Sequence, residues 1–257
     1  MTHALRAEWT KLRTVTATAW LLLGVIVSTV ALGAFAAHAV TYSGGSPRDV
    51  TKLSLTGVYL GQAVVAILAV QVMSGEYSCG MIRLTLTAIP RRPVVLAAKA
   101  ATVGGLVLTA GAVAMLASVL VGRLILPTSG FTAAHGYALL SLGNGATLRA
   151  TAGSALYLAL VAWFSLGVAA VVREAAVGVG VVLGLLYVFP VVAALVGDPH
   201  LQRHLEQIAP MTAGLAIQST VNVAHLPIAP WAGLGVLGAW AATALVAGGL
   251  LLTLRDA

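Results

Sequence analysis

Six apolar blocks, each long enough to cross a membrane, constrain the fold of this sequence more than any other feature. A helix needs about 20 apolar residues to cross the hydrocarbon core of a bilayer. The blocks cover about residues 20–40, 54–74, 94–126, 149–172, 175–196 and 231–254. Only 8% of the 257 residues are charged, whereas a typical soluble domain has about 25%. This composition indicates a membrane protein and excludes a cytosolic enzyme, a disordered protein and a secreted disulfide scaffold.

The apolar residues run continuously through each block, which favours helices over strands. The strands of a membrane barrel alternate apolar and polar residues over about ten positions, and the blocks lack that alternation. The third block is long for one crossing, so we expect it to be tilted or to enter the bilayer near Lys99. Only Arg173 and Glu174 separate the fourth and fifth blocks, which predicts a tight hairpin. The predicted fold is an all-α integral membrane protein with six transmembrane helices.

The distribution of Lys and Arg residues predicts that both termini are cytoplasmic. Cytoplasmic loops carry an excess of these residues, and with six crossings this orientation places nine of the 14 inside. The basic residues flank apolar blocks without interleaved aromatics, so we expect no nucleic-acid partner despite the net charge of +7. A signal peptide cleaved near Ala34-Phe35-Ala36 is an alternative for the first block, which is however longer than a typical signal sequence.

Residues 2–16 carry an amphipathic pattern ahead of the first block. Leu5, Trp9 and Leu12 recur at helical spacing, and basic residues occupy another face. The pattern predicts an interfacial helix on the inner leaflet, with Trp9 at the level of the lipid headgroups. An ordinary basic flank that only sets the topology is the alternative, and the two interpretations are compatible.

Motifs that would indicate an enzyme fail at the residues that carry the chemistry. Gly75 and Gly80 have the spacing of a phosphate-binding loop. Met81 and Ile82, however, stand where Lys and Ser or Thr must contact phosphate and magnesium. We therefore expect no catalytic residue, no metal site and no cofactor bound by this chain.

The connection 197–230 between the last two blocks contains a short polar helix and a mildly apolar stretch. Asp198-Pro199 is a typical helix start. His200 and His204 would share a face of that helix, but the residue after the first His is Leu rather than the Glu of a zinc protease, so a solvated polar segment is the preferred interpretation. The stretch 211–223 is too short to cross, so it either lies at the outer interface or dips in and returns.

Ionisable residues are almost absent from the interiors of the six blocks. Only His38 comes close, and it lies near the outer end of the first block. Transporters driven by ion gradients generally place Asp, Glu or His within their helices to carry the coupling ion. If this chain moves a solute, we expect the free energy to come from another subunit.

Two glycine pairs predict close approaches between helices. Gly57 and Gly61 lie four residues apart in the second block, as do Gly180 and Gly184 in the fifth. Packing within the chain explains either pair. A dimer seam through the fifth block, at Gly180 and Gly184, is the sharper alternative.

Residues 75–99, which include the predicted cytoplasmic loop 75–93, are the densest polar stretch of the chain. If it is helical from Glu76, an apolar face forms along it, and Pro90 and Pro93 end the helix around a basic pair. A short helix across the inner mouth of the bundle, followed by a stiff basic turn, is suited to contact a partner. A basic loop that only sets the topology is the alternative.

This loop resembles the first cytoplasmic loop of ABC-2-type permeases, the membrane subunits of bacterial ABC exporters. The positions that carry the resemblance are Glu76, Gly80, Arg83, Leu86, Pro90, Arg91, Arg92 and Lys99. The opening Ala7-Glu8-Trp9-Thr10-Lys11-Leu12-Arg13 also resembles the N-terminus of actinobacterial members. Met81 departs from the pattern of the family, in which Thr often follows the glycine.

The resemblance implies roles for both segments. The loop from Glu76 would be a coupling helix that docks on a separate ATPase subunit, which binds ATP and magnesium. Residues 2–16 would be a connecting helix that faces the same ATPase through Arg6, Glu8, Trp9, Lys11 and Arg13. Two permease copies, identical or paralogous, would pair near the first and fifth spans and assemble with two ATPases in the bacterial plasma membrane.

The predicted function is therefore that of a permease subunit of an ATP-driven exporter. The apolar span interiors favour an amphipathic or hydrophobic cargo such as a drug, a peptide or a lipid-like molecule, and membrane lipids as neighbours. A stand-alone secondary transporter is the first alternative and predicts dependence on an ion gradient. A lipid-modifying membrane enzyme is the second, and it would need His200, His204 and Glu206 to be active.

Overall fold

The computed structural model describes residues 2–44, 48–88 and 91–254, and every regular element within these ranges is a helix. Six of the helices are long and apolar enough to cross a membrane. They are α2 (Thr16–Ala39), α4 (Val58–Ser78), α6 (Arg92–Ile125), α7 (Gly145–Val172), α8 (Ala175–Leu195) and α11 (Pro230–Leu254). The predicted all-α fold with six spans is confirmed, and the chain is a multi-pass membrane protein.

Polar caps set several helix limits that hydropathy does not mark. The helix α7 begins at Gly145, ahead of the apolar block, because the Asn144 side chain accepts a hydrogen bond from Ala146 N at 3.0 Å. The second span begins at Val58 because Val50–Ser54 forms a separate helix, α3. Asp49 caps this short helix by accepting a hydrogen bond from Lys52 N at 2.9 Å.

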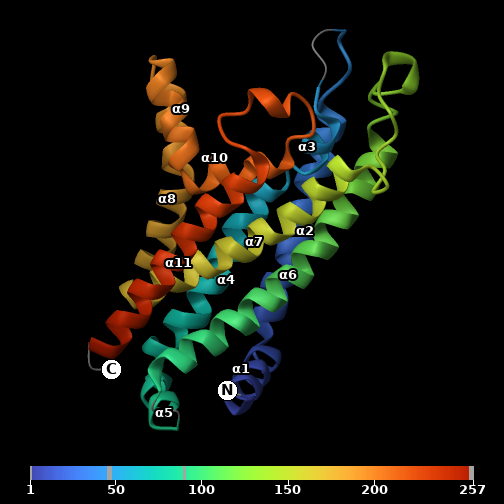
Figure 1. Cartoon of the computed structure of the whole chain (residues 1–257). Coiled ribbons are helices and arrows are strands. Elements are labelled where there is room, and N and C mark those ends of the chain that lie inside the picture. The colour runs from blue at the N-terminus through green and yellow to red at the C-terminus, as the bar shows by residue number, and fades with distance from the viewer. Residues whose placement is uncertain (1, 45–47, 89–90, 255–257) are drawn as a thin grey trace.

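The helix α7 lies at the centre of the bundle (Figure 1) and packs against α4, α6, α8 and α11. Within its most apolar stretch, 72% of the residues are buried. The corresponding share is 17% in both α2 and α8. These two spans therefore leave most of their apolar surface uncovered by the described part of the chain.

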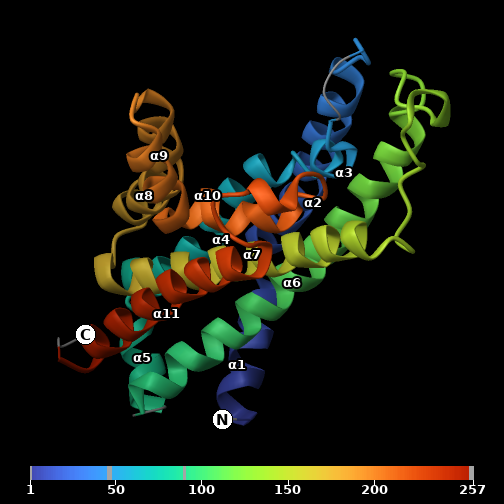
Figure 2. The same ribbon diagram turned by 45° about the horizontal axis from the view of Figure 1, so that its top comes forward.

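The first helix and the end of the last span lie at the same end of the bundle. This end, which we call the α1 end, contains α1 (Thr2–Thr14), α5 (Met81–Ala88) and the last turn of α11 (Figure 1). The opposite end, the α9 end, contains α3, α9 (Pro199–Ile208) and α10 (Pro210–Leu215) (Figure 2). The position of α1 and of the last turn of α11 at the same end agrees with an even number of crossings.

The described residues also contain three short 3-10 turns, at Ala133–His135, Ala216–Gln218 and Val223–His225.

The connection between the last two spans folds back into the bundle. Asp198 caps α9 by accepting a hydrogen bond from His200 N at 2.8 Å, as the sequence predicts, and His200 and His204 are exposed. The helix α10 and the turn Ala216–Gln218 pack against α7 and α11. Ile217 and Gln218 are fully buried. This stretch therefore inserts into the bundle, as in the second of the two predicted placements, and does not lie on the surface.

Backbone contacts hold this inserted segment in place. The Asp49 carboxylate accepts hydrogen bonds from Thr220 N, Thr220 Oγ1 and Val221 N. The Arg149 guanidinium donates to Ser219 O at 2.6 Å. The segment is therefore fastened to both α3 and α7 at the α9 end.

The two glycine pairs have different surroundings. A Cβ atom on Gly57 would lie 1.7 Å from Thr29 O, and one on Gly61 would lie 2.2 Å from Thr29 Oγ1. This pair therefore permits α4 to pack closely on α2. A Cβ atom on Gly180 or Gly184 would meet no described atom within 4 Å. The second pair has no packing role among the described residues.

Candidate functional site at the α1 end

The helix α1 packs one face against the start of α6. Ala4, Glu8 and Leu12 recur every four residues on that face and are buried. Trp9 is 50% exposed, so its ring is available to lipid headgroups or to a partner. The structure has a helix over Thr2–Thr14, and its buried face includes Glu8, which the sequence pattern did not indicate.

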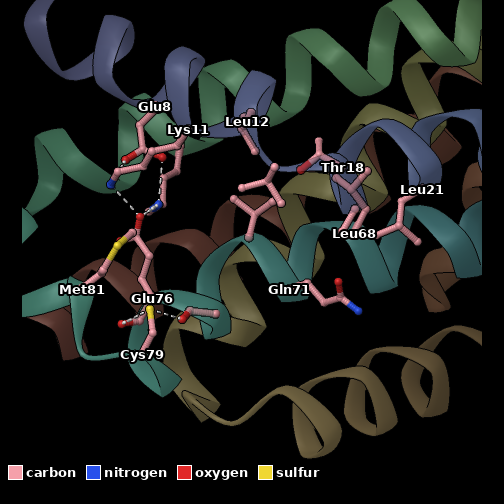
Figure 3. Close-up of a pocket in the computed structure, with 15 residues that line it drawn as sticks. Glu8, Lys11, Leu12, Thr18, Leu21, Leu68, Gln71, Glu76, Cys79 and Met81 are labelled. Carbon is pink, nitrogen blue, oxygen red and sulfur yellow. Dashed lines mark hydrogen bonds and ion pairs between the residues drawn. The ribbon is translucent and has the colours of Figure 1, made fainter.

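Four charged side chains from α1, α4 and α6 form one buried ion network, which consists of Glu8, Lys11, Glu76 and Lys99 (Figure 3). Lys99 Nζ lies 2.8 Å from Glu8 Oε2 and 2.6 Å from Glu76 Oε1. Lys11 Nζ lies 2.8 Å from Glu76 Oε1 and 3.2 Å from Glu8 Oε1. Lys11 also donates to Thr85 Oγ1 at 3.2 Å, which brings α5 into the same set of contacts.

The composition of the ion network explains how so many charges can be buried. Lys99 is only 1% exposed, and Glu8 and Glu76 are also buried. An isolated charge in such a place would carry a large desolvation cost, but two acids and two lysines neutralise one another. Burial alone would lower the pKa of Lys11. The hydrogen bond to Glu76 and the charge of Glu8 outweigh that effect and raise the pKa of Lys11 above its ordinary value.

The turn between α4 and α5 differs from the helix expected from Glu76 onward. The helix α4 continues through Glu76 to Ser78, and α5 begins only at Met81. Gly80 between them has a φ of +70°, in the left-handed region that glycine adopts without strain. Glu76 therefore belongs to the end of a membrane span, and the short helix that follows is a separate element.

The short helix α5 exposes apolar side chains. Leu84 is 71% exposed and Met81 is 40% exposed, whereas Ile82 is buried. Two further predicted positions have side chains outside the described residues, Arg83 and Leu86, and Pro90 lies wholly outside them. The described part of α5 thus presents an uncovered apolar surface at the α1 end.

Two arginine side chains, Arg92 and Arg173, bind the end of α11. Arg92 donates to Leu252 O at 2.5 Å, and Arg173 donates to Leu251 O at 3.4 Å. Cations are favourable at the C-terminus of a helix, where carbonyl groups lack intrahelical partners. Arg91 is exposed and forms the N-terminal boundary of α6. Of the predicted basic pair Arg91 and Arg92, Arg91 is therefore the residue that is more exposed to a partner.

The tight hairpin predicted between the fourth and fifth blocks is present. Arg173 ends α7 with a φ of 67°, and Glu174 caps α8. The Glu174 carboxylate accepts hydrogen bonds from Val177 N at 2.7 Å and from Ala176 N at 2.9 Å. These two backbone donors lower the pKa of Glu174.

A cavity of about 260 Å³ lies beside the ion network, between α1, α2 and α4 (Figure 3). Glu8, Lys11, Glu76 and Lys99 contribute to its lining. Its apolar lining residues include Leu12, Leu21, Leu68 and Val72. The cavity is therefore amphipathic, with a charged side and an apolar side.

The sequence did not identify a neutral polar cluster inside the spans. Tyr157, which is fully buried, donates a hydrogen bond to Gln62 Oε1, and Gln62 Nε2 lies 3.3 Å from Met211 Sδ. Tyr187 donates to the backbone carbonyl of Tyr59. The presence of Gln62 within an apolar block could have indicated this cluster, because a buried amide requires hydrogen-bonding partners.

The chain matches a sequence model described as ABC-2 family transporter protein over residues 4–191. The matched range begins in α1, includes the whole ion network and ends near the end of α8. No curated protein sequence matches the chain. Since the family match covers well over half of the sequence, the chain belongs to the ABC-2 family of transporter proteins.

Proposed function

We propose that this chain is the permease subunit of an ATP-driven exporter and that α1 and α5 connect it to a separate ATPase subunit. The observation that carries the proposal is the ion network, because it joins α1 to two membrane spans and contacts α5 through Thr85. A displacement of α1 or α5 would thereby reach α4 and α6 directly. Membership of a transporter family and six membrane-spanning helices agree with this role.

Burial distinguishes the predicted residues that would contact the ATPase from those that would hold the docking elements in position. Glu8, Glu76 and Lys99 are buried, so in this proposal they hold the docking elements in position. The exposed positions would contact the ATPase. They are Arg6, Trp9 and Arg13 of α1, Met81 and Leu84 of α5, and Arg91.

In the proposed cycle, ATP and magnesium bind to the ATPase subunits, which then close on each other. Closure would draw the α5 helices of two permease copies together. Because buried ion pairs lose stability when their partners separate, α1, α5 and the inner ends of α4 and α6 would move as one unit. The path between the permeases would then open toward the other side of the membrane.

The proposal places the α1 end in the cytoplasm of a bacterium, in accordance with the excess of Lys and Arg in the segments at that end. It also includes a second permease copy. The low burial of α2 and α8 leaves two apolar faces for lipid and for a partner. Gly180 and Gly184 lie on one of these spans without described neighbours, which supports α8 as part of the seam.

An amphipathic or hydrophobic cargo remains part of the proposal. Apart from Glu76 and Lys99 at the α1 end, the buried polar side chains of the described spans are neutral, as in the pair of Gln62 and Tyr157. A path between such surfaces would favour molecules with a large apolar part. Transport of hydrophobic drugs in vesicles should therefore exceed that of charged hydrophilic solutes.

A matched pair of surface variants tests the connection to the ATPase. The chain is purified from its host membranes, and co-purifying ATPase subunits are quantified by mass spectrometry. Leu84→Asp places a charge on the exposed surface of α5 and should reduce the recovered ATPase by about tenfold. Leu201→Asp makes the same change on α9, where Leu201 is 50% exposed, and should leave the recovery unchanged. Absence of any ATPase from the wild-type preparation would refute the proposal.

A further inference from the structure

Another cavity, an open groove of about 590 Å³, runs between α6 and α11 at the α1 end, where the start of α6 and the end of α11 converge (Figure 1). Small residues such as Ala97, Ala101 and Gly249 line it and leave the space open. Trp163 of α7 also lines it, and its ring is held in place because Nε1 donates a hydrogen bond to Ala100 O at 2.8 Å. None of the described residues that line the groove is charged, so it suits an apolar occupant.

The length of the groove matches one leaflet of a bilayer. The groove extends along residues 93–101 of α6 and along residues 245–253 of α11. At about 1.5 Å per residue, each wall is about 12 Å long. One leaflet contributes about 15 Å to the hydrocarbon core, which is about 30 Å thick. Both helices are membrane spans, and Val246 and Leu250 in the wall are more than half exposed. The groove therefore has the dimensions to hold the acyl chain of a lipid in the adjacent leaflet.

Arginine side chains gather where the groove reaches the α1 end. Arg92 directly precedes the first lining residue and donates to Leu252 O, and Arg173 donates to the neighbouring Leu251 O. Arg91 is exposed, and the first turn of α6 contains no acidic residue. Basic pockets between membrane helices bind acidic lipid headgroups. The charge at this end of the groove therefore complements a negatively charged headgroup.

We propose that this groove binds an anionic phospholipid of the adjacent leaflet, with one acyl chain between α6 and α11 and the headgroup phosphate beside Arg91 and Arg92. A second copy of this chain is a less suitable occupant, because the least buried spans are α2 and α8 and the groove lies on neither of them. The site lies entirely within this chain, so the proposal does not rest on an ATPase partner or on transport.

A pair of lipids with identical acyl chains measures the contribution of the headgroup. The full chain is expressed without an ATPase, since Arg91 also belongs to the proposed ATPase contact. It is purified in detergent and titrated with phosphatidylglycerol or phosphatidylcholine, and native mass spectrometry counts the bound lipids. Only phosphatidylglycerol carries a net negative charge, and attraction to the arginines should make its first molecule bind about tenfold more tightly. Equal affinities would overturn the proposal.

A pair of arginine variants locates the headgroup. Arg91→Gln removes an exposed charge beside the groove and should weaken binding of phosphatidylglycerol about fivefold. Arg13→Gln removes an exposed charge from α1, at the same end of the bundle, and should leave the binding unchanged. Equal weakening in the two variants would show attraction to the whole basic surface and would overturn the proposed position of the headgroup.

A pair of alanine variants tests the groove itself. Ala97 is exposed and lines the groove, so Ala97→Phe fills the space of the acyl chain and should abolish the preference for phosphatidylglycerol. Ala31→Phe makes the same change at an exposed position of α2 and should preserve the preference. Retention of the preference in Ala97→Phe would overturn the proposal. A dimer of the wild-type chain that dissociates in Ala97→Phe would also overturn it, because the groove would then hold a second copy.

Discussion

The two ends of the bundle fasten distant segments by different means. At the α1 end, charged side chains bind one another, and the four of them come from three helices, α1, α4 and α6. At the α9 end, Asp49 and Arg149 bind mainly backbone groups of the segment after Gln218. A backbone group stays present after any substitution other than proline, whereas a side-chain partner is lost with its residue. The α1 end should therefore be more sensitive to a single change.

The largest effect is expected at the centre of the ion network. Lys99→Met keeps the length of the side chain but leaves Glu8 and Glu76 buried with Lys11 as their remaining partner. Loss of one member of a buried ion pair typically lowers the free energy of unfolding by about 3–5 kcal/mol. Chemical unfolding in detergent, followed by circular dichroism, measures the change.

A matched control for this variant lies at the other end of the molecule. Lys52→Met removes an exposed lysine from α3, and its free energy of unfolding should remain within about 0.5 kcal/mol of the wild type. Equal losses in the two variants would show that the ion network contributes no more than an ordinary surface charge.

A smaller effect is expected at the α9 end. Asp49→Ala removes the cap of α3 and the contacts to Thr220 and Val221. The carboxylate is half-buried, so the expected loss of unfolding free energy is about 1–2 kcal/mol. Hydrogen exchange should increase locally at the amides of residues 219–221. Asp198→Ala, which removes only the cap of α9, should leave exchange in that segment unchanged.

The smallest effect concerns Lys11, the most exposed member of the ion network. Its pKa in the folded chain is raised above the ordinary value of 10.5, so its contribution to stability is complete below that pH. The contribution is lost as the pH rises through the folded-state pKa. As the pH rises above 10.5, the wild-type chain should therefore lose stability relative to Lys11→Met, as measured by thermal unfolding. A constant difference between the two would contradict the assigned ion pairs.

Features of the fold that depend on local interactions were predictable from the sequence, whereas features that depend on contacts between distant residues were not. The six spans, the hairpin at Arg173 and the start of α9 after Asp198 depend on local hydropathy and capping, and all were predictable. The break at Gly80 was missed because the polar stretch around it suits one continuous helix as well as two. The turn becomes evident only from the left-handed backbone at that glycine.

The ion network could not be predicted because it joins three helices that are separated in the sequence. Each of its lysines had a sufficient local explanation as a topology signal, and Glu8 appeared to be one more polar residue of an interfacial helix. The burial of Lys99 requires α1 to lie across the start of α6, and periodicity within either helix does not specify that contact. The same limit applies to Gln62, whose partner Tyr157 lies 95 residues further along the chain.

The separation of Glu8 and Lys99 by 91 residues also has a consequence for biosynthesis. When α1 leaves the ribosome, neither Glu76 nor Lys99 has been made, so Glu8 has only Lys11 as an ionic partner. Until α6 has been synthesised, α1 cannot bury its acidic side chain against Lys99, so Glu8 stays hydrated. The first helix to be synthesised is thus among the last to be fixed, and the completion of the ion network marks the moment at which the α1 end has assembled.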